Sequence, residues 1–166
     1  MSGERPAYYG KFRGVVTHND GPEGRIRATV PDVYGSEVSP FALPSVPYAG
    51  DGVGLHLMPP VGASVWFEFE QGDADRPVWS GCFWGPGQAP AATPDHKVLK
   101  TALATVTFDD STAEPGAPDT SGITITVKGL TITLDKDGIE INAGTHGVIT
   151  LADDKVTING DGLEVT

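Results

Sequence analysis

Three acidic turns near the end of the sequence carry the side chains best suited to bind a metal ion. The turns are Asp135-Lys136-Asp137-Gly138, the Asp153-Asp154 pair and the Asp161-Gly162 pair. Carboxylate oxygens suit calcium, but a calcium loop needs oxygen ligands at alternating positions and a closing Glu. The turns lack this pattern, and Asp and Gly are the residues that tight turns favour. The sequence therefore predicts turns here, and neither a metal nor another cofactor.

Carboxyl groups that could hydrolyse a glycosidic bond occur at the Asp109-Asp110 pair and at Glu114. Such hydrolysis needs two carboxyl groups beside a sugar-binding cleft, one of them kept protonated by apolar surroundings. Residues 109–120 are instead rich in turn-forming residues. The single cysteine, Cys82, lies among aromatic residues and is expected to be a small buried apolar residue. No nucleophile–base pair stands out, so the sequence predicts that the protein is not an enzyme, and a hydrolase with an unrecognised site is disfavoured.

From Ile123 onward, apolar residues alternate with Thr, Lys, Asp, Glu or Asn, in runs separated by Gly- and Asp-rich breaks. This period of two is typical of half-buried strands, and the breaks are typical of turns. A ribbon of short strands with one open apolar face is marginally stable alone. We therefore expect further copies of the chain to cover it. The predicted core of that assembly is Ile123, Ile125, Val127, Leu130, Ile132, Leu134, Ile139, Ile141, Ile149, Leu151, Val156 and Ile158, with Leu163 and Val165 at the end of the ribbon.

The composition favours an all-β protein of one or two small domains. Of the 166 residues, 39 % are apolar, which is enough for a core, and the 22 Gly and 14 Pro point to many turns. The formal net charge is −11, from 11 Lys and Arg against 22 Asp and Glu. Nucleic-acid binding normally requires a basic surface, so we expect no nucleic-acid partner.

The beginning of the chain, MSGERPAYYG, lacks the apolar segment of a signal peptide. No apolar run approaches the roughly 20 residues that cross a bilayer. We expect the chain to be made and folded in the cytoplasm.

The pattern divides the chain into four parts. About five predicted strands with large loops and no helix suit a small barrel of the OB type in the first half. A Gly-, Pro- and Ala-rich stretch, GPGQAPAATP, then reads as a linker. The predicted parts are a leader at 1–7, an OB-fold domain at 8–85, a linker at 86–96 and a strand-built segment at 97–166.

The segment DHKVLKTALATVTFDD permits two interpretations. Leu99, Leu103 and Val106 lie at helical spacing after a possible cap at Asp95. The Thr content and the VTF run favour a strand instead, as do the surrounding β patterns.

Residues 8–85 resemble the OB-fold domain of central spike proteins from contractile injection systems, a family that includes phage baseplate spikes and type VI secretion spikes. The motifs that carry the resemblance are YYGKFRGVV, GRIRATVPDVYG and PYAGDGVGLHLMPPVGASVWFEFEQGDADRPVWSGCFWG, in that order. The segments KVLKTALATVTFDD and GITITVKGLTITLDKDGIEINAG are similar to the intertwined trimeric β-helix, the needle, of the same family. Only residues 86–96 separate the two parts, too few for the lysozyme domain that some phage members carry there.

The resemblance implies a structural role. Three chains would form a homotrimeric spike at the tip of the apparatus, joining the hub protein of the baseplate to a tip protein of the proline-alanine-alanine-arginine (PAAR) type at Leu163 and Val165. The spike would be incorporated into the baseplate of the particle and would touch the target membrane only during puncture. The alternative is a carbohydrate-binding OB module on a trimeric stalk.

Two groups of residues remain as candidate sites. Some spikes of this family bind an axial metal through a His-x-His motif, but here only His146 is present, in a turn between glycines, and we expect it to point outward. Lys11, Arg13, Arg25 and Arg27 lie on the polar faces of predicted barrel strands. An OB barrel can use such a face to bind oligosaccharide or single strands, but subunit contacts are the favoured interpretation.

Overall fold

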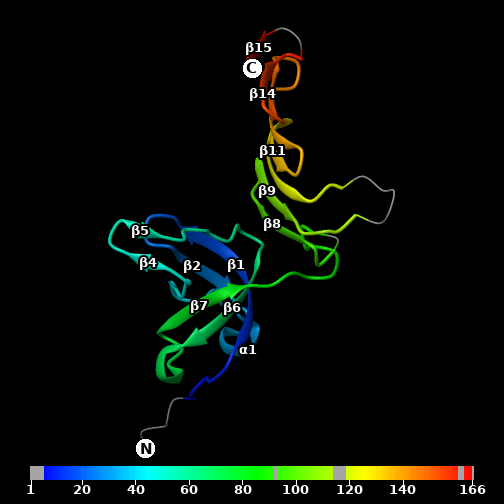
Figure 1. Cartoon of the computed structure of the whole chain (residues 1–166). Helices are drawn as coiled ribbons and strands as arrows, with labels where there is room; N and C mark the ends of the chain where they lie inside the picture. Colours follow the sequence, from blue (N-terminus) through cyan, green and yellow to red (C-terminus); the bar gives the residue numbers. More distant parts are fainter. Residues whose placement is uncertain (1–5, 92, 114–118, 161–162, 166) are drawn as a thin grey trace, which may run out of the picture. The chain divides into compact units, whose positions relative to one another are not determined.

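The computed structural model describes residues 6–91, 93–113, 119–160 and 163–165, the last three by their backbone only. The chain forms two units, Met1–Gln88 and Ala89–Thr166 (Figure 1). Both are built from strands, and the described helical segments are α1 (Pro31–Tyr34) and a short 3₁₀ turn, η1 (Glu70–Gly72). The prediction of an all-β fold is therefore confirmed. The boundary between the units falls inside the predicted linker, although β8 already begins at the last residue of that linker, His96.

The N-terminal unit is a closed barrel. Its strands are β1 (Phe12–Asp20), β2 (Arg25–Thr29), β3 (Leu43–Pro44), β4 (Ala49–Gly50), β5 (Val53–Gly54), β6 (Ser64–Phe69) and β7 (Pro77–Cys82). Five of them form one sheet in the order β2-β1-β6-β7-β3. The sheet closes because Ile26 and Ala42 exchange backbone hydrogen bonds of 3.3 and 2.8 Å. Closure leaves the barrel without a free sheet edge at that point.

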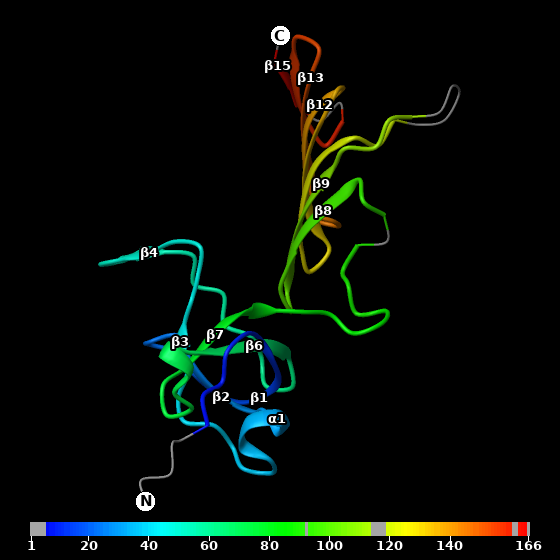
Figure 2. The same cartoon turned by 90° about the horizontal axis from the view of Figure 1, so that it is seen from below.

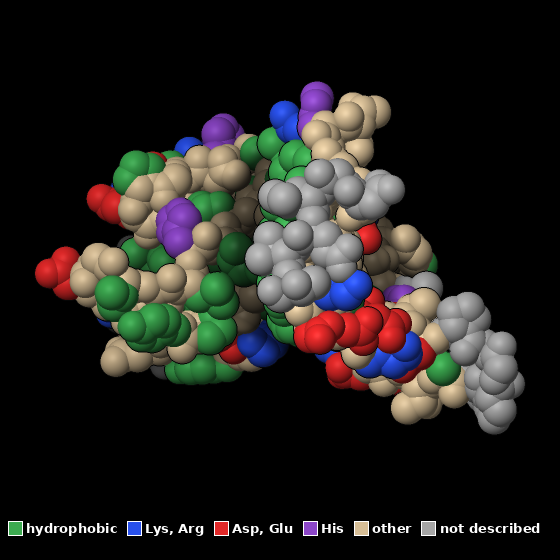
Figure 3. Space-filling view, turned by 45° about the horizontal axis from the view of Figure 1, so that its top comes forward, with side chains coloured by type: hydrophobic (Ala, Val, Ile, Leu, Met, Phe, Trp, Pro, Cys, Tyr) green, Lys and Arg blue, Asp and Glu red, His purple; other side chains and the backbone are tan. Residues whose placement is uncertain are grey.

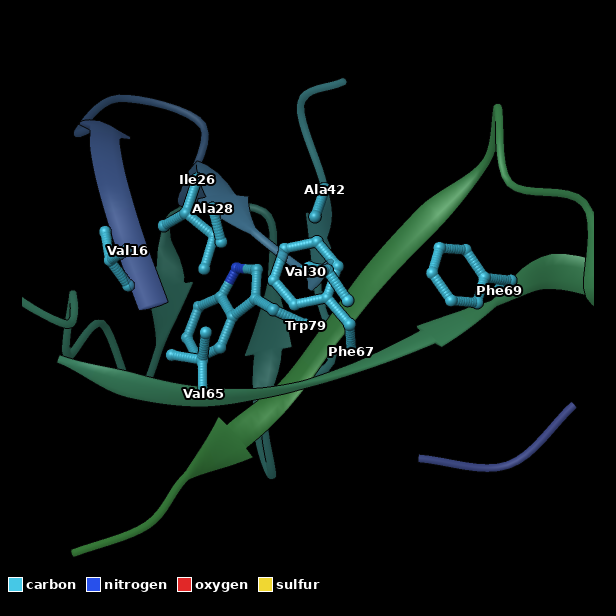
Figure 4. Close-up of a cluster of buried hydrophobic side chains, with 9 residues drawn as sticks. All are labelled: Val16, Ile26, Ala28, Val30, Ala42, Val65, Phe67, Phe69 and Trp79. Atoms are coloured by element: carbon cyan, nitrogen blue, oxygen red, sulfur yellow. The ribbon is translucent and has the colours of Figure 1, made fainter. Parts of the chain in front are cut away.

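Alternating residues of the barrel strands point inward and form its core (Figure 4). In β6, Val65, Phe67 and Phe69 are buried and the residues between them are half-buried, as the period-two pattern predicts. The indole Nε1 of Trp79 donates a hydrogen bond of 2.9 Å to the Gly24 carbonyl oxygen, so its polar atom is satisfied inside the core. The buried residues are Val16, Ile26, Ala28, Val30, Ala42, Val65, Phe67, Phe69 and Trp79.

Aromatic rings fill one end of the barrel, where Tyr34 and Phe69 lie 6.1 Å apart in an edge-to-face arrangement. The hydroxyl of Tyr34 donates a hydrogen bond of 2.6 Å to the Ala74 carbonyl oxygen. Burial raises the pKa of Tyr34 to about 12, and the charges of Asp75 and Asp73 add to this effect. The neutral phenol is therefore the form that the folded barrel stabilises.

We expect Tyr34→Phe to lower the stability of the barrel by about 1 kcal/mol at neutral pH, the usual contribution of one hydrogen bond. Above the ordinary pKa of 10.0 the unfolded chain loses the phenolic proton, whereas the folded barrel keeps it until about pH 12. The wild type therefore loses stability relative to the variant as pH rises through this window. Urea unfolding followed by tryptophan fluorescence at pH 7 and pH 11 measures the difference, and an equal difference at both pH values would contradict the assignment.

The C-terminal unit is a single eight-stranded antiparallel meander (Figure 2). Its strands are β8 (His96–Lys100), β9 (Ala104–Asp109), β10 (Gly122–Val127), β11 (Leu130–Asp135), β12 (Gly138–Asn142), β13 (Val148–Ala152), β14 (Lys155–Ile158) and β15 (Leu163–Val165). The strand interpretation of the ambiguous segment is correct, because β8 and β9 form a hairpin there. Strands β10 and β11 join through Lys128 and Gly129, whose φ angles are 51° and 84°, as a tight two-residue hairpin turn requires.

No described side chain from residue 89 onward is buried. The sheet has no second layer, so in the isolated chain both of its faces lie open to solvent. A sheet of this kind normally gains its stability by packing against another layer. The C-terminal unit therefore lacks a core of its own.

Candidate interaction surfaces

One face of the C-terminal sheet carries two continuous rows of apolar residues, because opposed residues of neighbouring strands point to the same side. We call this surface the apolar face. The first row is Leu99, Val106, Ile125, Ile132, Ile141, Ile149 and Ile158, one residue from each of the strands β8–β14. The second row is Phe108, Ile123, Leu134, Ile139, Leu151 and Val156, with Lys97 opposite Phe108 at the edge.

The apolar face is open to solvent along its length. Exposed fractions run from 36 % at Ile139 to 46 % at Leu130 among the predicted core residues in β11 and β12. Soluble monomers rarely expose a contiguous apolar surface of this extent, and a larger one marks an interface. The structure places the predicted core residues of β10–β14 on this one face, while the side chains of Leu163 and Val165 lie outside the described part. That they form a trimer core stays a prediction.

The opposite face of the same sheet is polar. Its central row is Thr107, Thr124, Thr133, Glu140, Thr150 and Thr157. Threonine suits both a strand and water, since it is β-branched and carries a hydroxyl. The apolar face therefore has the chemistry of a surface that is buried in an interface, and the opposite face has the chemistry of a surface in contact with water.

The apolar face also contains residues that the sequence analysis missed. Leu99 and Phe108 are 49 % and 44 % exposed, and Val106, the neighbour of Leu99 in the first row, is half-buried. The signal that could have found Val106 and Phe108 was the alternation Thr105-Val106-Thr107-Phe108, which the helical spacing of Leu99, Leu103 and Val106 obscured.

The acidic turns show the hydrogen bonding of turns. The Asp135 carboxylate accepts hydrogen bonds from the backbone N–H groups of Asp137 and Gly138, at 2.9 and 3.1 Å. Lys136 lies 2.7 Å from Asp137, and Figure 3 shows acidic and basic side chains together on one face of this unit. Within the described ranges no group of three or more His, Cys, Asp or Glu could hold a metal ion. Asp161 and Gly162 lie outside the described residues.

His146 is exposed in the turn between β12 and β13, where its backbone N–H donates a hydrogen bond of 3.1 Å to the Ala143 carbonyl oxygen. The expectation that its side chain points outward fits this exposure in the single chain.

The carboxylates considered for hydrolysis have structural partners. Hydrogen bonds from the Ser111 hydroxyl and backbone N–H, with smaller contributions from Thr120 and His96, lower the pKa of Asp109 to about 2. Asp109 is therefore ionised at neutral pH and unsuited to act as a general acid. Asp110 pairs with Lys97 at 2.6 Å, and Glu114 lies outside the described residues.

The basic side chains of Lys11, which precedes β1, and of Arg13 in β1 are engaged within the barrel. Lys11 Nζ lies 3.1 Å from the Glu68 carboxylate and donates a hydrogen bond of 2.9 Å to Ser80. The Arg13 guanidinium lies 5.2 Å from the Trp66 ring centroid and 5.0 Å from that of Phe83, within cation–π range.

The arginines of β2 are engaged in the same way. Arg25 pairs with Asp20 at 2.9 Å, and Arg27 donates a hydrogen bond of 2.8 Å to the Ser39 carbonyl oxygen. Both guanidinium groups also lie over the Phe41 ring. These four basic side chains on the outer face of the barrel thus make contacts within the chain. This arrangement does not favour binding of an oligosaccharide or of a single-stranded nucleic acid.

Cys82 is exposed, so the prediction of a buried cysteine is wrong. It is the last residue of β7 and lies beyond Trp79, the last buried side chain of that strand. Partial burial nevertheless raises the pKa of its thiol, so this cysteine is not an activated nucleophile.

A long excursion between β3 and β6 exposes apolar side chains of the barrel unit. We call residues 45–62 the arm; its centre is the β4–β5 hairpin, in which Gly50 pairs with Val53. Met58 and Val46 pack against the barrel core. The exposed large apolar side chains of the arm are Tyr48, Val53, Leu55, Leu57 and Val61, each at least 45 % exposed. The sequence analysis did not identify this surface.

Among the described residues, no helix has the length and apolar character needed to span a membrane.

Two sequence families match the chain, one for each unit. Residues 12–84 match the type VI secretion system/phage-baseplate injector OB domain, and residues 96–164 match the phage baseplate V C-terminal trimerisation domain. No curated protein matches the chain. The two matches in this order define a structural protein of an injector baseplate.

The chain belongs to the spike family of phage baseplates and type VI secretion systems. The prediction of an N-terminal OB-fold barrel is confirmed, and the C-terminal unit is a trimerisation domain, which identifies copies of the chain as its partners. The family places the protein in the baseplate of an injection particle.

Proposed function

We propose that this protein is the central spike of a contractile injection apparatus, acting mechanically and without catalysis. Three copies pack their apolar faces together as an intertwined β-helical needle. The barrel units form a collar that joins the needle to the hub of the baseplate. When the apparatus contracts, the needle concentrates force on the target envelope and helps to pierce it.

The observation that carries this proposal is the open apolar face of the C-terminal sheet. Two apolar rows cross the strands without interruption, and no described residue of the unit is buried. Because the match to a trimerisation domain covers residues 96–164, the expected cover is two further copies. A needle of this kind unfolds slowly, since its registered core must open as one unit.

Light scattering of the purified chain at several dilutions tests the proposal. We expect a mass of three times 17.3 kDa that survives dilution. A monomer at all concentrations would remove the physical basis of the needle.

The arm supports a docking role for the barrel unit. Its exposed apolar side chains require a protein surface to cover them, and residues 45–62 contain no Lys or Arg that would need a charged partner. We assign this surface to the hub.

Leu57→Asp should weaken binding to the hub protein of the same particle by at least about tenfold, because it places a carboxylate in an apolar contact. Leu57 is 49 % exposed, so the barrel itself should remain folded. Co-purification with the hub measures the loss, and Asp51→Asn, elsewhere in the arm, is the control. Unchanged hub binding by Leu57→Asp would contradict the assignment.

The free edge of β15 supports a tip partner. β15 stands at one end of the eight-stranded order, and among the described residues its one pairing partner is β14. An open strand edge invites pairing with other chains unless it is covered. A small tip protein of the PAAR type is the proposed cover at Leu163 and Val165.

Deletion of residues 148–166 removes β13–β15 and should abolish binding of the tip protein while leaving a folded trimer. The remaining rows on β8–β12 still supply an apolar core. Light scattering and co-purification with the tip protein measure the two effects, and unchanged tip binding would refute this part of the proposal. The double variant Leu163→Asp, Val165→Asp narrows the site, with Glu164→Gln as its control.

A further inference from the structure

We infer that the trimer core begins at the β8–β9 hairpin, where Phe108, Leu99 and Val106 of three copies form its base layer. The inference rests on the proposed trimeric needle and assigns residues that the pattern from Ile123 onward left outside the core.

The register of the sheet places these residues on the apolar face. Val106 lies opposite both Leu99 and Ile125, and Phe108 lies opposite Ile123. Each of them therefore continues a row of the face through β9 without a change of side. A second copy of the chain that packs along the rows from β14 to β10 would contact these side chains next.

Their exposure fits an interface with a second copy. Phe108 is 44 % exposed and Leu99 49 %, as much as the predicted core residues further along the sheet. On the opposite face, their neighbours Val98 and Thr107 are half-buried. The match to the trimerisation domain starts at residue 96, the first residue of β8, so this surface is continuous with the region that joins the copies.

The second apolar row ends at a neutralised charge. Lys97 lies opposite Phe108 on the edge strand, and its ammonium group pairs with Asp110 at 2.6 Å and donates to the Asp95 carbonyl oxygen at 3.2 Å. A charged residue at a sheet edge opposes pairing with further strands. Phe108 is therefore the last apolar residue of the second row, and Leu99 on the edge strand is the last of the first row.

Phe108 is the largest side chain of the second row. The row continues with the smaller Ile and Leu side chains and reaches Val156 on β14. An aromatic side chain buries more area than the aliphatic ones beyond it. Removal of Phe108 should therefore have a large effect on the association of the copies, and little effect on the isolated chain.

Dissociation of the full-length trimer at one fixed urea concentration, chosen so that the wild type dissociates slowly, is followed by light scattering and tests the inference. We expect Phe108→Ala to speed dissociation at least about tenfold, as loss of a buried aromatic side chain requires, and Thr107→Ala on the opposite face to change it little. A trimeric wild type with equal dissociation of both variants would overturn the base layer and leave the needle intact. A monomeric wild type would overturn both.

A second measurement covers the case in which Phe108→Ala does not fold. In a Cys82→Ser background, Phe108→Cys should form disulfide-linked dimers on oxidation, because two of three copies can pair, whereas Thr107→Cys should not. Equal cross-linking of the two variants, or none in either, would contradict the placement of Phe108 between copies.

Discussion

We expect Ile132→Asp to convert the trimer into monomers while the barrel stays folded. Ile132 lies in the first apolar row, opposite Ile125 on one side and Ile141 on the other, and is 37 % exposed in the single chain. Association would bury one unpaired carboxylate per copy. Each costs about 3 kcal/mol, so three copies weaken the assembly by roughly six orders of magnitude.

Light scattering measures the loss of the trimer, and tryptophan fluorescence reports the barrel separately, because Trp66, Trp79 and Trp84 all lie in the N-terminal unit. The matched control is Thr131→Asp, because Thr131 directly precedes Ile132 in β11 and lies on the opposite, polar face of the sheet. If Ile132→Asp remained trimeric, or if both variants became monomeric, the apolar face would not be the surface that joins the copies.

Gly138→Ala should destabilise the C-terminal unit by about 3 kcal/mol or more per protomer. Gly138 opens β12 with a φ of +142°, and an added Cβ would lie 1.9 Å from the Leu151 carbonyl oxygen. The conformation is nearly restricted to glycine and costs about 1–3 kcal/mol for other residues. The clash adds a similar amount, because the backbone of β13 would have to move.

Thermal unfolding followed by circular dichroism should show a midpoint lowered by more than about 10 °C. The control is Gly144→Ala, at a φ of +63° with no atom within 4 Å of the added Cβ. It should cost only the left-handed backbone conformation, about 1 kcal/mol. A Gly138→Ala protein as stable as Gly144→Ala would show that β12 and β13 do not approach this closely.

The strands of both units could be predicted because their pattern is local. The alternation in Val65–Phe69 and from Ile123 onward appears in the structure as β6 and as the C-terminal sheet. The β8–β9 hairpin was harder to predict, since the positions of Leu99 and Val106 are compatible with a helix as well as with strands. Only the pairing of β9 with β8 and β10 distinguishes the strand interpretation from the helical one.

Other features depended on contacts between distant residues. The exposure of Cys82 follows from where the barrel core ends, and a run of aromatic neighbours in the sequence does not reveal that position. The engagement of Arg13 by Trp66 and Phe83 joins residues from β1, β6 and the segment after β7. The surface of the arm was not predicted because its many Gly and Pro residues break the alternating pattern around β4 and β5, which are only two residues long. The exposed apolar side chains of the arm become apparent only in the structure.

The sequence by itself determined the chemistry of the two faces of each strand, since side chains alternate across an extended backbone whatever its partners are. It also determined the turns, through Asp, Asn and Gly at the positions where the backbone reverses. Only the tertiary structure decided which residues stand opposite one another. Register joins separate alternating strands into two unbroken apolar rows and extends those rows to Leu99 and Phe108, because the pairing of each strand is fixed by its neighbours and its turns.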